Sequence, residues 1–437
     1  MSRVGRLRFR SLRVAVAALL AVLPAAPTRL VAQDSAASVD GAQPTPTSAF
    51  REALRSSKVT LGLRYRLEQV EDDTPRFAGR NALASTLRTE LAVETGQLRG
   101  FSVRLAVEDV SVLGNGQLYD NLGAGSLSNQ VSDRPVVADP DLTEVLEAAL
   151  VWTPSEQTEV QIGRRRLAYD DHRFVGTVAW RQHHQSVDAL TLEQAIGGRW
   201  RARYALLDRV HRINGGRDDL TGHLLNLSAA LGPGRLVLFG YQLDYDADSR
   251  RFLSSNTLGG RYSGSAPLRG GRELLFEAQL AQQRDAGGNP LDFEALYARG
   301  ELGIGGEAWS VRAGWELLGG DGEVALQTPL ATLHKFNGWA DKFLTTPVWG
   351  LEDLFVRYDQ EHGRWSWSVW LHRFGADGGA PSRQDYGSEL DAEVSLRLGG
   401  AEGPLLALRV ADYHAEDLFA DTTKAMLYAV WSARLDR

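Results

Sequence analysis

Cysteine is missing from this sequence altogether, although the chain is 437 residues long. A chain without cysteine has no disulfide framework, so its stability must come from packing and from backbone hydrogen bonds. Lysine is almost as scarce, because it occurs only at positions 58, 335, 342 and 424. Arginine therefore carries nearly all of the positive charge, and its planar guanidinium holds carboxylates in a fixed, two-pronged geometry better than an ammonium does.

Long apolar runs are also missing after the first residues. The run Val14–Leu23 follows a series of arginines and is too short to cross a bilayer, which is the pattern of a secretory signal peptide. We predict that this peptide comprises residues 1–32. The whole chain has a net charge of −7, and removal of a peptide that contains arginine but no acid makes the exported chain more acidic still. Nucleic acid is therefore not an expected partner.

Residues 33–57 have little apolar content, and we expect a flexible periplasmic lead-in with one short helical turn at Phe50–Arg55. From Lys58 onward, apolar and polar residues alternate, as the period of two of a β-strand requires. Tryptophan and tyrosine gather near segment ends, like the aromatic girdles of a membrane barrel, and the polar faces carry charges of both signs, which suits a wet lumen. We count about eighteen such segments, near residues 58–70, 80–95, 101–111, 142–153, 157–167, 185–195, 199–210, 220–231, 235–246, 252–263, 272–284, 291–304, 308–317, 351–360, 364–374, 385–398, 404–414 and 423–434.

The connectors between these segments alternate between short and long. Every second connector is a short, mostly glycine-rich turn, whereas the others include the long segments 112–141, 168–184, 319–350 and 375–384. A soluble β-sandwich gives no reason for this alternation, but bacterial outer-membrane barrels combine short periplasmic turns with long extracellular loops. We therefore predict an all-β fold: a transmembrane antiparallel β-barrel of about eighteen strands over residues 58–437. Its expected surroundings are the lipid and lipopolysaccharide of a Gram-negative-type outer membrane.

One stretch, Leu317–Leu351, breaks the alternation, because most of it has neither helical nor strand periodicity. Long aperiodic loops in compact domains are commonly functional, and the aromatic residues of this one argue against disorder. We expect the loop to fold over or into the mouth of the barrel. Simple packing against the barrel rim competes with ligand binding as the role of its aromatic and charged residues. The candidate ligand contacts are His334, Lys335, Trp339, Asp341 and Lys342.

Several pieces of the sequence resemble the alginate export family of outer-membrane proteins. The most specific piece is 327–343, which reads QTPLATLHKFNGWADKF, and shorter pieces lie at 85–88, 135–140, 163–166, 173–176, 180–182 and 386–391. The resemblance covers almost the whole mature chain. It implies an outer-membrane barrel of eighteen strands with an arginine-lined constriction. The best-known member of this family passes an anionic uronate polymer outward.

Arginines on the polar strand faces and around the third outer loop, at 168–184, are the candidate pore residues. A ring of guanidinium groups lowers the electrostatic cost of moving a carboxylate or phosphate through a narrow pore. Bracing of the wall by pairing with the acids of the same faces is the alternative role. The predicted pore and substrate-binding set is Arg64, Arg66, Arg88, Arg104, Arg164, Arg166, Arg173, Arg181, Arg312, Arg357 and Arg397.

The parity of Arg164 and Arg166 needs a special arrangement. Both share the parity of Val160 and Ile162, which are expected to face outward. Either a bulge resets the register, or the two arginines lie beyond the bilayer. Both arrangements place them at the mouth of the barrel.

The predicted function is a passive outer-membrane channel for anionic solutes, of the alginate-export type, for uronate polysaccharide or oligosaccharide. The alternatives are a non-selective or small-organic-acid uptake porin and, in a different class, an outer-membrane barrel enzyme. The sequence contains no GxSxG, HExxH or nucleotide-binding motif, so we predict no enzyme, catalytic residue, metal ligand or cofactor. We expect a monomer, whose direction of transport comes from a concentration gradient or from a periplasmic secretion partner.

Overall fold

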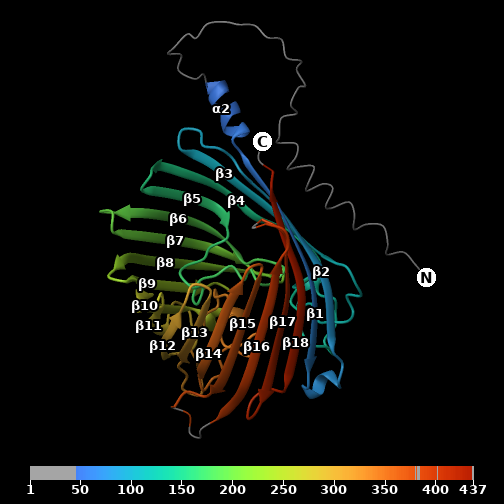
Figure 1. Ribbon diagram of the computed structural model, residues 1–437. Coiled ribbons are helices and arrows are strands. Elements are labelled where there is room, and N and C mark those ends of the chain that lie inside the picture. Colours follow the sequence, from blue (N-terminus) through green and yellow to red (C-terminus); the bar gives the residue numbers. More distant parts are fainter. Residues whose placement is uncertain (1–45, 379, 381–383, 401, 436–437) are drawn as a thin grey trace, which may run out of the picture.

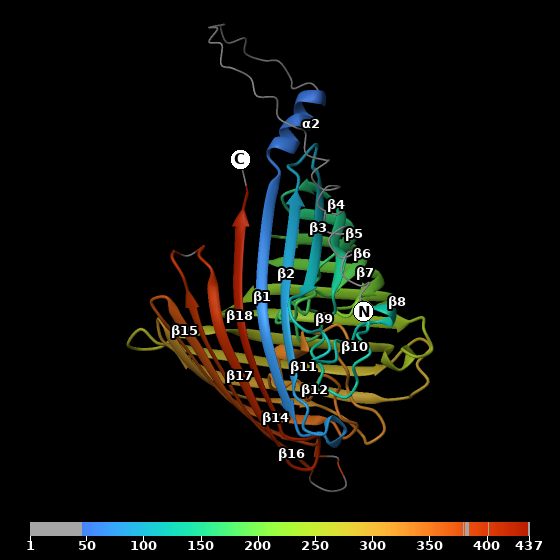
Figure 2. The ribbon, with the colours of Figure 1, turned by 90° about the vertical axis from the view of Figure 1, so that its right-hand side faces the viewer.

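The computed structural model describes residues 46–435 except 379, 381–383 and 401. Its main element is an 18-stranded antiparallel sheet in which successive strands pair and β1 also pairs with β18. The sheet is therefore a closed barrel (Figure 1), and the seam between its first and last strands is seen in Figure 2. The predicted signal peptide and residues 33–45 of the predicted lead-in lie outside the described residues.

In the part of the chain that the structure describes, one α-helix, α2 (Pro46–Arg55), precedes the wall. Among the described residues, no helix is both long and apolar enough to cross a membrane. The short 3₁₀ helices are η1 (Pro75–Phe77), η2 (Gly125–Leu127), η3 (Arg251–Leu253) and η4 (Leu333–Lys335). The strands are β1 (Lys58–Asp72), β2 (Ala82–Glu94), β3 (Phe101–Val112), β4 (Leu142–Ser155), β5 (Thr158–Arg165), β6 (Ser186–Ile196), β7 (Trp200–His211), β8 (Arg217–Leu231), β9 (Gly234–Tyr245), β10 (Ser255–Pro267), β11 (Glu273–Asp285), β12 (Glu294–Gly305), β13 (Trp309–Leu318), β14 (Leu351–His362), β15 (Trp365–Gly375), β16 (Asp385–Arg397), β17 (Leu405–Ala415) and β18 (Thr422–Arg434).

The two faces of the wall differ in chemistry as the alternation predicts. Leu258, Leu280 and Leu302 are 72%, 62% and 63% exposed, so the apolar face is the outside of the barrel. Their polar neighbours Gln279 and Glu301 are only 3% and 7% exposed, so the polar face is the inside. An apolar exterior and a closed ladder of backbone hydrogen bonds are what a strand needs in hydrocarbon, where no water can satisfy peptide groups.

The two ends of the barrel differ in the length of their connectors. The end next to α2 carries only short turns between strands, and the turn after β2 contacts the helix, because Gly96 N donates to Ala53 O at 2.9 Å. The opposite end carries the long connectors. By the rule for bacterial outer-membrane barrels, short turns are periplasmic and long loops extracellular. We call the two ends the tight-turn end and the long-loop end.

The prediction of an antiparallel barrel with about eighteen strands is confirmed. Most strand boundaries lie within two residues of their predicted positions. A larger difference occurs before β10, which begins at Ser255 because the preceding residues form the 3₁₀ helix η3. A stretch of alternating residues does not distinguish a short 3₁₀ turn from the first residues of a strand, since both are only a few residues long.

A charge placed on the outer face tests the orientation of the wall. Leu280→Arg, in the body of β11, puts a guanidinium into hydrocarbon and is expected to lower the free energy of unfolding in lipid vesicles by about 2–4 kcal/mol. Leu268→Arg, in the tight turn after β10, is the matched control. It is expected to lower the free energy of unfolding by only about 0–1 kcal/mol, because residue 268 lies near the membrane–water interface. Guanidinium unfolding followed by tryptophan fluorescence measures both. Equal costs would contradict the assignment of the outer face.

Candidate functional site

Two long loops fold back into the barrel from the long-loop end. They are called here the third loop (residues 166–185) and the seventh loop (residues 319–350). Both carry charged or aromatic side chains that are buried, such as Arg173 and His183 in the third loop and Trp339 in the seventh. Buried backbone and charged groups must find partners within the protein. The contacts of these two loops with each other and with the wall therefore define the candidate site.

The two loops pair with each other as a short parallel bridge between Val175 and Leu330. Gly176 N donates to Leu330 O at 2.8 Å, and Thr332 N donates to His172 O at 3.0 Å. A Cβ atom at Gly176 would lie 2.3 Å from Thr332 Oγ1, so the close approach of the loops requires glycine at this position. The two loops thus form one unit inside the lumen.

The tip of the seventh loop is a tight turn with left-handed backbone at Asn337, Gly338 and Asp341, where φ is 55°, 85° and 61°. Asparagine, glycine and aspartate are the residues that adopt this conformation at least cost. Gly338 is also packed against the wall, because a Cβ atom there would lie 2.3 Å from Glu389 Oε2. The turn therefore brings the backbone of the loop onto the carboxylates of β16.

Those carboxylates bind the loop through its backbone. Trp339 N donates to Asp391 Oδ2 at 3.1 Å, and Ala340 N donates to Glu389 Oε1 at 2.6 Å. The Trp339 ring in turn lies under the guanidinium of Arg409, with the Arg409 Cζ atom 4.2 Å from the ring centroid. Trp339, a predicted ligand contact, is only 8% exposed and also lines the cavity described below.

At the junction of the two loops, the indole of Trp180 stacks on the imidazole of His334, with ring centroids 3.3 Å apart and an interplanar angle of 11°. His334 Nε2 lies 2.7 Å from Arg409 Nη1, and its Nδ1 lies 2.8 Å from Asp341 Oδ1. Because a guanidinium can only donate, Nε2 is the acceptor and Nδ1 carries the proton. Burial is the main cause that lowers the pKa of His334 to about 3, and Arg409 acts in the same direction. The ring is therefore neutral at physiological pH.

Asp341 is the charged centre of the seventh loop. Its carboxylate lies 2.7 Å from Lys424 Nζ on β18 and 3.4 Å from Arg181 Nη2 of the third loop. Burial alone would raise the pKa of Asp341, but Lys424, His334 and Arg181 together hold it well below its usual range. The neighbouring Lys342 pairs with Asp72 on β1 at 3.0 Å. The loop is thus tied to both strands that close the barrel.

Arg173 of the third loop forms a second buried centre. Its side chain is 1% exposed, and its Nε lies 2.8 Å from Glu316 Oε1 on β13. Its Nη2 donates to Asn337 Oδ1 of the seventh loop at 3.3 Å, and its guanidinium lies 4.8 Å from the centroid of Phe336. This arginine, predicted to bind substrate, joins the two loops to the wall.

The loop between β3 and β4, residues 113–141, completes the assembly. Its Asp139 pairs with Arg66 of β1 and accepts a hydrogen bond from Gln182 N at 3.1 Å. Arg66 also donates to the carbonyl of Trp180 at 2.8 Å. Although burial opposes ionisation, Arg66 and Arg181 lower the pKa of Asp139. Wall arginines therefore hold the third loop through carboxylate and carbonyl groups.

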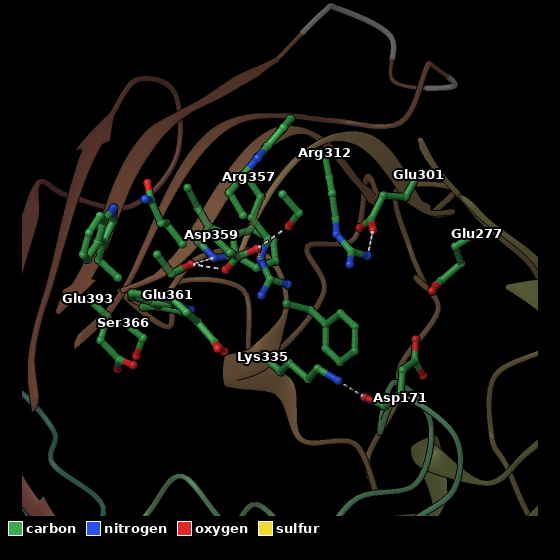
Figure 3. A pocket seen from close by; sticks show the side chains of 18 of the residues that line it. Asp171, Glu277, Glu301, Arg312, Lys335, Arg357, Asp359, Glu361, Ser366 and Glu393 are labelled. Carbon is green, nitrogen blue, oxygen red and sulfur yellow. Dashed lines mark hydrogen bonds and ion pairs between the residues drawn. The ribbon is translucent and has the colours of Figure 1, made fainter. Parts of the chain in front are cut away.

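A cavity of about 820 Å³ lies between these loop tips and the wall strands β10 to β17. Its lining runs from His334, Lys335 and Phe336 at the loop tips to Glu307 and Ala308 in a tight turn. The cavity thus extends from the loop tips to the tight-turn end. Figure 3 shows Lys335 projecting into this cavity with Arg312 and Arg357 on its opposite side.

Both signs of charge line the cavity. Most of its arginines are paired: Arg312 lies 2.9 Å from Glu301, and Arg357 pairs with Asp359 at 2.5 Å. Lys335 differs from them, because its Nζ donates to the carbonyl of Asp171 at 2.8 Å and no carboxylate of the described residues lies within 4.0 Å of it. The basic residues of the lining are Arg261, Arg299, Arg312, Lys335, Arg357 and Arg409, and the acidic ones are Asp171, Glu277, Glu301, Glu307, Asp359, Glu361 and Glu393.

Most of the predicted pore arginines do face the lumen, but in several separate groups. Arg64 and Arg66 contact the third loop, and Arg64 Nη1 donates to Ala179 O at 2.8 Å. Arg312 and Arg357 line the cavity. The remaining members turn toward acids: Arg88 toward Glu108 (3.9 Å), Arg104 toward Glu159 (3.8 Å), Arg166 toward Glu90 (3.0 Å) and Arg181 toward Glu68 (3.2 Å).

Two predicted pore residues lie elsewhere. Arg164 is on the outer face, where it pairs with Asp188 of β6 at 2.9 Å, next to the exposed Ile162. The break in alternation comes after it, so that Arg166, unlike Arg164, turns inward. Arg397 is exposed at the tight-turn end and donates to Gly403 O at 3.2 Å. Parity gave Arg164 the outward face that it has, and the expected reset of the register takes effect only after it. Arg397 has inward parity, but it is the last residue of β16 and lies at the end of the strand.

Several residues of the site were absent from the predicted set. Trp180 and Asp139 lie within the short pieces 180–182 and 135–140 that carry the family resemblance. The resemblance could therefore have identified both residues. Arg299 and Arg409 share the polar parity of their strands and were equally within reach. Glu108 shares the polar parity of its strand, but its contact with His184 of the third loop could not be predicted from parity, because that loop is distant in sequence.

A closed barrel with an apolar exterior, a charged lumen and loops folded into it is the architecture of an outer-membrane channel. Solved structures agree at the level of the fold. OccK9 (OpdG) of Pseudomonas aeruginosa has a TM-score of 0.71 at 17% identity, covering 87% of this chain and 99% of that chain. OpdK of the same organism, solved with vanillate, has a TM-score of 0.69 at 14% identity, covering 87% of this chain and 99% of that chain. OccAB3 of Acinetobacter baumannii has a TM-score of 0.69 at 12% identity, covering 87% of this chain and 100% of that chain.

The sequence identifies the family more closely. The family profile described as "Alginate export" matches residues 56–332. This match covers more than half of the chain, so the protein belongs to the alginate export family, and it is an outer-membrane channel protein. No curated protein matches the chain.

Removal of one buried charge tests whether ion pairs hold the seventh loop in the lumen. Asp341→Asn leaves Lys424 and Arg181 without their carboxylate partner, and breaking a buried pair in this way costs about 3–5 kcal/mol. We expect faster trypsin cleavage within the seventh loop and larger current fluctuations in a planar bilayer. Glu323→Gln, an exposed acid of the same loop, is the control and should change neither. Equal cleavage rates in the two variants would disprove the role of Asp341.

The neutral state of His334 predicts how the loop responds to acid. An unfolded histidine takes up a proton near pH 6.5, whereas the docked His334, whose pKa is about 3, does not. Acidification from about pH 6.5 toward pH 3 therefore favours release of the loop. His334→Gln should make the seventh loop easier to cleave by protease at pH 7. The variant should, however, lose less of its remaining resistance to protease between pH 6 and pH 4. An unchanged pH slope in this variant would assign the acid response to other groups, such as Asp341.

Proposed function

We propose that this protein is a passive channel for small anionic solutes, such as organic acids and acidic oligosaccharides, and that the loop-capped cavity is where they bind. The observation that carries the proposal is Lys335. This lysine is exposed at the tip of the seventh loop, projects into the cavity and is held in place by a backbone carbonyl rather than by an acid. An ammonium without a carboxylate partner is free to bind one from a solute.

The surroundings of Lys335 support a solute that has both an acidic group and an apolar ring face. Arg357 stacks on Trp370, with its Cζ atom 4.5 Å from the ring centroid. Lys335 Nζ lies 5.7 Å from the centroid of Phe336. Cations held next to aromatic faces suit saccharides and aromatic acids, because these solutes present C–H or π surfaces beside their carboxylates. Vanillate, with which the structurally similar OpdK was solved, has this chemistry.

The loops argue for a small solute. Arg173, Asp341 and Asp139 are buried in ion pairs that hold the loop assembly across the lumen. A long polymer would have to displace this assembly, whereas a short solute has only to enter the cavity that it caps.

Passage of a uronate polymer is the second candidate, because the chain belongs to a family named for alginate export. It requires that the third and seventh loops leave the lumen during transport. Buried ion pairs can be broken and reformed in this way if a partner or the polymer itself supplies competing charges. Block by polymer and block by monomer therefore have to be compared.

Reversal potential in a salt gradient is the decisive measurement for the reconstituted protein. We expect a preference for chloride over potassium, and block of the current by glucuronate and by vanillate. In Lys335→Gln the apparent affinity for either blocker should fall about tenfold, which corresponds to about 1.4 kcal/mol for a lost charge-assisted contact. Lys58→Gln, at the tight-turn end of β1, is the matched control and should leave the block unchanged.

The result with polyuronate separates the two candidates. If polyuronate blocks the current only in the Asp341→Asn variant, whose seventh loop is released, the result favours a small-solute channel whose loops exclude polymer. Efficient block or passage of polyuronate in the unmodified protein favours the polymer conduit. A cation-preferring current that is indifferent to glucuronate, vanillate and polyuronate would refute both.

A further inference from the structure

A row of three glutamates crosses three neighbouring strands of the wall. Glu90 of β2 is the register partner of Glu108 of β3, and Glu108 is in turn the register partner of Glu144 of β4. Like charges directly opposite each other on adjacent strands destabilise a sheet. Glu108 is fully buried, and Glu144 is only 15% exposed, so water does little to screen this pair. Cations must therefore lie among the three carboxylates.

Two of the three glutamates have cationic or donor partners on the protein. Glu90 lies 3.0 Å from Arg166 Nη1. Glu108 accepts a hydrogen bond from the backbone N of His184 at 3.0 Å and lies 2.5 Å from its Nδ1. Glu144 differs, because its buried Oε1 atom accepts no hydrogen bond from any described residue.

The group nearest to that orphaned oxygen is the imidazole of His183 at the end of the third loop. This ring is fully buried, and its Nε2 lies 3.0 Å from the carbonyl oxygen of Pro140. Because a carbonyl can only accept, Nε2 carries a hydrogen and the neutral ring presents a lone pair at Nδ1. Nδ1 itself makes no hydrogen bond among the described residues, although it lies 3.3 Å from Glu144 Oε1 and 3.4 Å from Glu108 Oε1.

These three atoms have the spacing of ligands around a small metal ion. Bonds of about 2.0–2.1 Å to a tetrahedral Zn²⁺ put neighbouring ligand atoms about 3.3–3.4 Å apart. The two distances from His183 Nδ1 match this value, and the three residues offer ligand atoms that all lie within 4.8 Å of one another. Calcium fits less well, because it takes oxygen ligands at about 2.3–2.6 Å and has no preference for imidazole. A histidine that donates its second N–H to a backbone carbonyl is also the usual arrangement of a metal ligand.

We propose that His183 Nδ1, Glu108 Oε1 and Glu144 Oε1 bind one divalent transition-metal ion of the zinc class. The partly exposed Glu144 provides access from the lumen, where water supplies the remaining coordination. One imidazole and two carboxylates are a ligand set that binds such ions with the charge of the site neutralised.

A proton on His183 is the competing occupant. An imidazolium at this position would also offset the charge of Glu108 and Glu144, but its N–H would point between two oxygens without a well-formed hydrogen bond to either. An ion between the three atoms contacts all of them. The two occupants differ in what they predict for added metal.

The bound ion has a structural consequence. His183 belongs to the third loop, whereas Glu108 and Glu144 belong to the wall, so the ion fastens the loop to two strands. The fastened segment follows directly on Arg181 and Gln182, which contact Glu68 and Asp139 in the loop assembly. Occupancy of the site therefore stiffens the loops that cap the cavity.

The test uses the full-length protein in detergent after treatment with a chelator. Titration with Zn²⁺ at pH 7.5, followed by calorimetry, should give one site per chain, and the ion should raise the thermal midpoint and protect the third loop from proteolysis. Glu144→Gln should weaken binding at least tenfold and abolish the thermal shift. His414→Asn is the control for exposed histidines and should leave both unchanged.

X-ray absorption at the zinc edge keeps the proposal testable if a variant does not fold. The unmodified protein should show a nitrogen and oxygen shell with a single imidazole. A shell with several imidazoles, an absence of binding to the unmodified chain, or equal binding by a folded Glu144→Gln protein would each overturn the proposal, and His183 would then hold a proton.

Discussion

Hydrocarbon offers no hydrogen-bond partner to a peptide group, and the whole structure depends on this constraint. Strands satisfy it only if every edge is paired, so β1 must meet β18 and the sheet must close. A barrel of this many strands encloses a lumen that its own side chains cannot fill. The third and seventh loops, folded into that lumen, narrow it and create the cavity at their tips. The functional site is therefore made of loops, but its position is fixed by the wall.

The loops are held by charge rather than by apolar packing alone. Arg173 and Glu316 are each 1% exposed, and Asp341 has two cationic partners from different parts of the chain. Buried ion pairs add little net stability, because the cost of desolvation offsets most of their attraction, but the loss of one partner is costly. Such contacts select one position of a loop over all others. That property suits a channel, since the size of its opening depends on where the loops lie.

The wall was predictable because its signal is local. Alternation places each strand and each face from a few neighbouring residues, and a departure occurs where β5 ends at Arg165, between the outward Arg164 and the inward Arg166. The site was predictable only in part. The seventh loop and several of its residues stood out by composition, but the stacking of His334 on Trp180 and the pairing of Asp139 with Arg66 join segments that are far apart in the sequence. No local pattern encodes those partners, because each depends on the closed barrel that brings them together.

The seventh loop also lies across the seam of the barrel. Lys342 bonds to Asp72 on β1 and to Thr422 on β18, while Asp341 bonds to Lys424 on β18. Figure 2 shows β1 and β18 side by side at this seam. The seventh loop thus connects the first and last strands of the barrel. The binding site for this segment is complete only when β18 pairs with β1. The seventh loop can therefore take its final position only after the barrel has closed.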